Sequence, residues 1–226
     1  MGVSARTLVL VAVVGISLPT LIGAQSTPTT ASAETRIQLA NLLVEDRRYW
    51  EAIRVFDEAR EYAVGEQLTR VSVGMVKSLL AAAEFTRAVV EAQVLGELAP
   101  EEPEVLAVIA DALWAGGLFD EAEGVYRDVL ALDSESGEGR HGVARSLATR
   151  HQFDEALDWL GAALEVSPEV PEFHHTLGHV YQRMHRFGAA ADAYQRYVDL
   201  LAPLARNEKA DWARSQIPFL RSFGER

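Results

Sequence analysis

A short motif returns along this chain at intervals of 34 residues. It reads Phe-Asp-Glu-Ala at residues 119–122 and again at 153–156, and Phe-Gly-Ala-Ala at 187–190. Two earlier copies, at 49–52 and 85–88, keep an aromatic residue three places before the alanine. A period of this length is typical of chains that stack helix pairs into a solenoid, in which each unit packs only against its neighbours. The sequence therefore predicts an all-α repeat protein.

A second pattern lies upstream of each motif. Twelve residues before the anchoring alanine stands a small or slim residue, in turn Ala40, Val76, Ala110, Ala144 and Gly178. An apolar residue precedes each one, beginning with Leu39, and a leucine or tyrosine follows three places later. These offsets place the set on one face of a helix, where a small residue lets a second helix approach closely. Each second helix then carries apolar residues at helical spacing, such as Tyr126 and Val129.

Together these features resemble the tetratricopeptide repeat family. The fifth unit matches the family pattern best, with Leu177, Gly178, Tyr181, Phe187, Ala190 and Tyr194. The resemblance implies a right-handed α-solenoid of about five helix pairs, with repeats at residues 33–66, 69–102, 103–136, 137–170 and 171–204. The first two anchors are 36 residues apart, which indicates a two-residue insertion near Gly65. The third unit has a Gly116-Gly117 turn between its helices, and the first unit lacks one.

The period stops after Pro203. Residues 205–226 are predicted to form a capping helix, because the last unit of a solenoid exposes an apolar face that needs a cover. Trp212, Ile217 and Phe219 are expected on its apolar side, and Pro218 is expected to end or kink it.

The N-terminus has the pattern of a secretory signal peptide. Arg6 precedes an apolar run at residues 8–18, and Ile22-Gly23-Ala24 offers small residues for cleavage. Residues 1–24 are therefore predicted to be a signal peptide, residues 25–32 a flexible linker, and the protein an exported one of the bacterial periplasm or cell envelope. An alternative stays open: residues 7–24 are 18 in number, at the lower edge of a bilayer span, and would tether a subunit of an envelope complex if uncleaved.

Composition excludes several classes of chemistry. The chain has no cysteine, so it has no disulfide, thiolate zinc site or cysteine nucleophile. A net charge of −12 argues against nucleic-acid binding. No phosphate-binding loop, dinucleotide fingerprint or Gly-x-Ser-x-Gly motif occurs. Carboxylates gather on the second helices, for example Asp120, Glu121 and Asp128, where a solvated surface is expected. We expect no enzyme activity and no cofactor.

In the tetratricopeptide repeat family, the first helices line a concave groove that holds partners. The resemblance selects these partner-binding residues: Asn41, Arg70, Lys77, Trp114, His141, Arg145, His175, His179, Gln182 and Arg183. Apart from Asp111, the charged residues at groove positions are basic. This predicts a scaffold that captures an acidic segment or terminal carboxylate of a protein or peptide partner, more tightly as pH falls through about 6.5 and the histidines gain charge. The alternative is that these charges merely solvate an open groove.

Three groove histidines raise a different possibility. His175 and His179 are four residues apart, and His141 is expected on the neighbouring helix at a similar depth. Three converging imidazoles suit zinc, copper or nickel, which would make the protein metal-binding or metal-responsive. The segment between the two later histidines lacks the glutamate of zinc peptidases, so hydrolysis is not implied.

Overall fold

The computed structural model describes residues 30–99, 101–201 and 208–224. Within these residues the chain forms eleven helices and no strand, which confirms the predicted all-α class. The helices are α1 (Thr30–Glu45), α2 (Tyr49–Arg60), α3 (Glu66–Ala81), α4 (Phe85–Leu98), α5 (Pro103–Ala115), α6 (Phe119–Leu132), α7 (Gly137–Thr149), α8 (Phe153–Val166), α9 (Pro171–Arg183), α10 (Phe187–Leu200) and α11 (Glu208–Gly224). The predicted signal peptide lies outside the described residues, and α1 begins inside the segment assigned to the linker.

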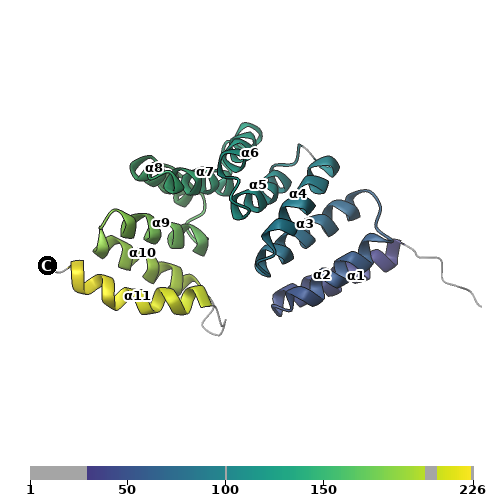
Figure 1. Cartoon of the computed structure of the whole chain (residues 1–226), viewed down its shortest axis with the longest axis horizontal. Helices are drawn as coiled ribbons and strands as arrows, with labels where there is room; N and C mark the ends of the chain where they lie inside the picture. Colours follow the sequence, from purple (N-terminus) through teal and green to yellow (C-terminus); the bar gives the residue numbers. More distant parts are fainter. Residues whose placement is uncertain (1–29, 100, 202–207, 225–226) are drawn as a thin grey trace, which may run out of the picture.

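The helix pairs stack in chain order into an arch. Its two ends, α1–α2 and α10–α11, both lie at the open side (Figure 1). Every helix packs on its sequence neighbours, and successive first helices also contact one another: α1 with α3, α3 with α5, α5 with α7, and α7 with α9. This is the connectivity of a solenoid, in which each unit contacts only its neighbours and is stabilised by them.

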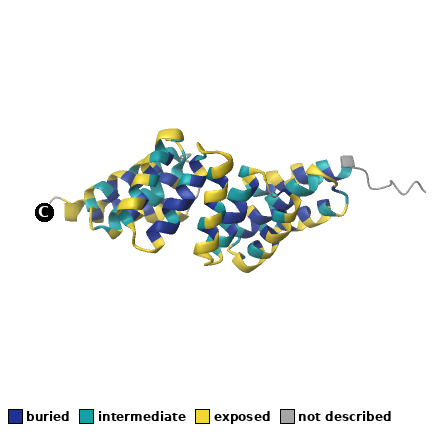
Figure 2. Ribbon diagram, turned by 90° about the horizontal axis from the view of Figure 1, so that it is seen from above, coloured by how far each residue is buried: buried dark blue, intermediate teal, exposed yellow. Residues whose placement is uncertain are grey.

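The predicted register is confirmed by burial. All five anchoring alanines are fully buried: Ala52, Ala88, Ala122, Ala156 and Ala190. Buried positions run along the whole array between the helices (Figure 2). Leu39 is an exception, since it is 49% exposed where its counterparts Met75 and Val143 are buried. No preceding unit packs against α1 among the described residues, so a position that is interior in later units faces solvent in the first.

Every first helix of a pair ends in the same three-residue turn. The middle residue of each turn has a φ between 58° and 83°, and these residues are Arg47, Ala83, Gly117, His151 and His185. In the third unit Gly117 N–H donates to the carbonyl of Trp114 (3.1 Å), and Leu118 N–H donates to that of Leu113 (2.9 Å). This doubly bonded left-handed ending is the Schellman motif. The motif recurs in every pair, although only Gly117 is the glycine that the conformation favours.

The insertion predicted near Gly65 appears in the lengths of the helices around it. Gly65 itself has a φ of 54° and stands directly before α3. Helix α3 has 16 residues, whereas α5, α7 and α9 have 13 each. The connection at residues 61–65 is also one residue longer than that at 133–136, whereas α2 has 12 residues and the other second helices have 14, so the net increase in the anchor spacing is two residues.

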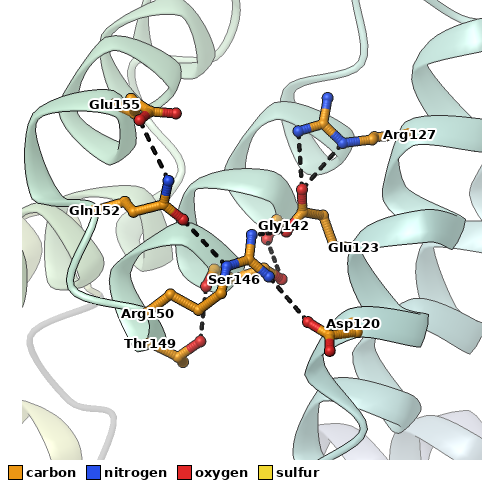
Figure 3. A network of polar contacts seen from close by, with 9 residues as sticks. All are labelled: Asp120, Glu123, Arg127, Gly142, Ser146, Thr149, Arg150, Gln152 and Glu155. Atoms are coloured by element: carbon orange, nitrogen blue, oxygen red, sulfur yellow. Dashed lines mark hydrogen bonds and ion pairs between the residues drawn. The ribbon is translucent and has the colours of Figure 1, made fainter.

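A polar network ties the third and fourth units together on the outer surface (Figure 3). Arg150, from the turn between α7 and α8, pairs with Asp120 at 3.1 Å and also with Glu123 of α6. Arg127 reaches the same Glu123 at 2.8 Å. Burial raises the pKa of Glu123, but the hydrogen bonds from Arg150 and Arg127 outweigh it and hold the pKa below its usual value. The acidic outer surface is thus partly neutralised by arginines of the neighbouring unit.

Helix α11 covers the end of the array by packing on α10. Its buried side chains are Ala210, Ala213, Ile217 and Leu220. Of the residues predicted on its apolar side, Ile217 is buried, and Trp212 is 42% exposed but packs its ring against Tyr194 at 5.4 Å. The prediction is wrong for Phe219, which is 57% exposed. Two alanines, not the aromatic residues, set the close contact.

The sequence also predicts that Pro218 ends or kinks α11. Pro218 does not end the helix, which continues to Gly224. Pro218 and Arg214 are both exposed, so water can reach the carbonyl that the missing proline N–H would have bonded. Among the described helices, none is long and apolar enough to cross a membrane.

Candidate functional site

The concave surface holds two hollows lined by the first helices. The N-terminal hollow, of about 470 Å³, lies on α1, α3 and α5 and includes Asn41, Arg70 and Lys77. The second, which we call the Trp114 pocket, has a volume of about 370 Å³ and lies on α5, α7 and α9. Six of the predicted residues line it: Trp114, His141, Arg145, His175, His179 and Arg183. The structure thus distributes the predicted groove residues over two separate places.

Gln182 is the predicted residue that lines neither hollow. Its amide oxygen accepts a hydrogen bond from the hydroxyl of Tyr194 at 3.0 Å, so the side chain is directed toward α10. Its described contact is therefore with the second helix of its own unit.

Arg145 is held rigidly at one wall of the Trp114 pocket. Its Nη2 donates to Asp111 Oδ1 (2.8 Å) and to the Tyr126 hydroxyl (2.6 Å), and its guanidinium lies 4.3 Å from the centre of the Trp114 ring. The Tyr126 hydroxyl donates to the same carboxylate oxygen at 2.6 Å. Burial raises the pKa of Tyr126 far above its usual value, so this donor keeps its proton. The ion pair and cation–π contact fix Arg145 and Trp114 as a preformed surface.

The three histidines do not converge on one point. His141 is buried, with Nε2 2.8 Å from Thr176 Oγ1 and its ring packed against Phe173 at 4.7 Å. His175 lies instead against aromatic rings of α10 and α11, with the Tyr197 ring at 5.0 Å. The described residues contain no group of three or more histidine or carboxylate side chains arranged to hold a metal ion. This arrangement argues against the alternative of a three-histidine metal site, because packing directs two of the imidazoles elsewhere.

Burial also changes how these histidines titrate. It lowers the pKa of His141 well below the usual value, and it lowers that of His175 to about 4, with a further contribution from Lys209. The pKa of His179 is lowered as well, by partial burial of its ring and then by Arg183, although the residue as a whole is exposed. The expectation that the histidines gain charge near pH 6.5 is wrong, because a charged imidazole is poorly solvated at these positions.

The groove is not basic along its whole length, contrary to prediction. Three carboxylates, Glu66, Glu102 and Glu104, line the N-terminal hollow beside Arg70 and Lys77. Arg70 is also paired with Glu34 of α1. Glu66 and Glu104 lie at the starts of α3 and α5, and Glu102 lies directly before α5. The groove positions taken from the repeat family lie further along each helix, so they do not include these carboxylates.

Basic character is concentrated in the Trp114 pocket. Arg145, Arg183 and Lys209 line it with a single carboxylate, Glu172. Lys209 was missed by sequence reasoning because it belongs to α11, which lies outside the repeat and returns toward the groove only in the folded chain. Thr149 was missed too, although its position four residues after Arg145 places it on the same helix face.

A wider hollow of about 1140 Å³ lies across the open side of the arch. Residues of the first two units, including Leu80 and Phe85, line it together with His175, Tyr197 and Lys209 from the far end. A segment bound in the groove would therefore contact both ends of the solenoid.

No protein-family description and no curated protein matches the sequence. Solved structures do resemble the fold. A thermophilic TPR protein of Thermus thermophilus, TTC0263, aligns with a TM-score of 0.71 over 82% of this chain and 99% of its own, at 19% identity. MamA from Desulfovibrio magneticus RS-1 aligns with a TM-score of 0.56 over 74% of this chain and 94% of its own, at 17% identity.

Both similarities extend over nearly the full length of the solved chains, and the first of these is a TPR protein. They agree with the helix pairing, the buried anchors and the 34-residue register described above. Over its described residues, the protein folds as a tetratricopeptide-repeat solenoid of five helix pairs followed by a capping helix.

Proposed function

We propose that the protein is an exported scaffold that holds a protein or peptide partner in its concave groove, with an acidic side chain of the partner in the Trp114 pocket. The observation that carries this proposal is the pocket itself. A preformed Trp114–Arg145 surface stands beside Arg183 and Lys209 in a hollow of about 370 Å³. An aromatic wall and fixed cations together suit a carboxylate on an apolar stem.

Arg183 is the residue through which this proposal is best tested. It is exposed, and its contacts are one bond to His151 Nδ1 (3.0 Å) and a stack on the Phe153 ring (5.6 Å). Arg145 is less suitable, because reversing its charge would place two carboxylates together at Asp111 and remove a buried contact. A variant at Arg183 alters the charge of the pocket and leaves the Asp111–Tyr126–Arg145 network in place.

The experiment is affinity capture from a cell-envelope extract, followed by measurement of binding to each captured protein. We expect Arg183→Glu to weaken the binding of the specific partner by about tenfold or more, and salt to weaken the wild type. Arg196→Glu is the matched control, because it makes the same charge change at an exposed position of α10 and should bind normally. Capture through this pocket is refuted if the captured proteins bind both variants equally well and if salt does not weaken their binding to the wild type.

Export is proposed from the N-terminal pattern, Arg6 followed by an apolar run and Ile22-Gly23-Ala24. N-terminal sequencing of the protein from its native host should find Gln25 as the first residue. An intact Met1 or Gly2 in a membrane fraction would favour the tethered envelope subunit instead.

A further inference from the structure

Helix α4 differs from the other second helices on its exposed side. Val90, Val94 and Leu98 are 58%, 41% and 39% exposed, and their spacing of four residues makes them one stripe. At the positions equivalent to Val90 and Val94, the other second helices carry charged or small residues: Arg54 and Glu58 on α2, Gly124 and Asp128 on α6, Asp158 and Ala162 on α8, and Asp192 and Arg196 on α10. The position of Leu98 is apolar in α6, α8 and α10 too. The acidic outer surface of the solenoid is thus interrupted by an apolar stripe at α4.

A hollow of about 220 Å³ adjoins this stripe. Met75 and Leu79 of α3 line it together with Thr86 and Val90 of α4, and the charged residues Asp57, Arg87 and Glu91 complete its lining. Its volume leaves room for one side chain of a partner. The surface at α4 therefore offers an apolar ridge and a place for a side chain to enter.

The charges on the same helix face are arranged symmetrically about this ridge. Arg87 stands three residues before Val90, and Glu97 stands three residues after Val94. Neither Arg87 nor Glu97 forms an ion pair with another described residue. If two such helices pack antiparallel, each Val90 lies opposite Val94 of the other copy, and each Arg87 lies opposite Glu97.

The same pairing places Leu98 of one copy opposite Thr86 of the other, beside the hollow. An interface with a two-fold axis requires a surface that is complementary to itself, and this face meets the requirement in shape and in charge. We propose that α4 is a self-association surface, through which two copies of the chain form a two-fold dimer with antiparallel α4 helices. The concave grooves take no part in this contact.

The test is the oligomeric state of the purified protein, measured by sedimentation velocity over a range of concentrations. We expect the wild type to shift toward twice the mass of one chain. Val94→Asp should remove the dimer, whereas Val166→Asp, the same change at an exposed valine of α8, should leave it intact. The melting temperature of Val94→Asp should stay near that of the wild type, because the side chain is not buried.

Charge exchange gives a sharper test. Arg87→Glu and Glu97→Arg each place like charges opposite one another, and each should weaken the dimer by about tenfold or more. The double variant restores opposite charges and should dimerise again. An equal mixture of the two single variants should form the heterodimer, since the glutamate introduced at position 87 of one chain then faces the arginine introduced at position 97 of the other.

Two results would overturn the proposal. One is a wild type that sediments as a single chain up to about 100 µM, a concentration at which even a small specific interface associates. The other is a dimer that persists in Val94→Asp or ignores the charge exchange, which would place the contact on another surface.

Discussion

At the scale of single residues, three glycines of the first helices leave room for aromatic rings. A Cβ at Gly142 of α7 would overlap the ring of Tyr126 from the preceding unit, and Gly74 stands in the same relation to Phe56. Gly178 does so with Tyr194 of its own unit. Rings of this size are buried only because the facing residue has no side chain.

Gly142→Ala should therefore lower the free energy of unfolding by about 1–3 kcal/mol through overpacking. Gly161→Ala is the control: Gly161 is exposed within α8 with open space around it, so the change should raise stability by about 0.5–1 kcal/mol through helix propensity. Denaturant unfolding of both variants measures the difference. An unchanged or more stable Gly142→Ala protein would show that Tyr126 can move aside.

At the scale of elements, the recurring turn places non-glycine residues in a left-handed conformation that costs them about 1–2 kcal/mol. Ala83 has a φ of 59° there, whereas Gly117 occupies the equivalent place without this cost. We expect Ala83→Gly to stabilise the protein by about 0.5–1 kcal/mol and Gly117→Ala to destabilise it by about 1 kcal/mol. Thermal and denaturant unfolding measure both changes. A destabilised Ala83→Gly protein or a stabilised Gly117→Ala protein would contradict the prediction.

The capping helix α11 gives a second prediction at this scale. Leu220 is fully buried against α10, so Leu220→Ala should cost about 2–5 kcal/mol. Phe219 is its neighbour in sequence but is 57% exposed, so Phe219→Ala should change stability by about 0.5 kcal/mol or less. Comparable losses in both variants, measured by denaturant unfolding, would mean that the aromatic side of α11 is also packed.

At the scale of the whole molecule, the partly buried His175 makes stability depend on pH. His175 has a pKa of about 4 when folded and about 6.5 when unfolded, so between these values the unfolded chain binds more protons. Stability is thus complete above about pH 6.5 and falls as pH decreases toward about 4. From His175 alone we expect a loss of about 2 kcal/mol between about pH 7 and about pH 5.

Urea unfolding at these two pH values measures the loss. His175→Gln should reduce it, because glutamine takes up no proton and the difference that remains then comes from His141 and His179, whose pKa values are also lowered. A stability that is equal at both pH values in the wild type would show that the folded protein accommodates charged imidazoles.

The features that depend on contacts within a unit or with its nearest neighbour could be predicted from the sequence. The register of the helix pairs and the burial of Ala52 or Ala156 follow from sequence offsets, because each contact joins residues of one unit or its nearest neighbour. The same holds for the acidic outer surface and for the place of the capping helix. Local periodicity contains that information.

The rest depends on how the units come together. Leu39 is exposed because no preceding unit packs against α1 among the described residues, and Phe219 is exposed because α11 packs on α10 through its other face. Lys209 reaches the groove from outside the repeat, and Glu102 enters it from beside a helix end. The proton affinity of His175 depends on aromatic rings from α10 and α11. The sequence by itself therefore determined the repeat and its register, whereas burial at the ends, the charge of the groove and the state of its histidines were decided by tertiary structure, because desolvation and charge pairing depend on residues that no periodic pattern relates.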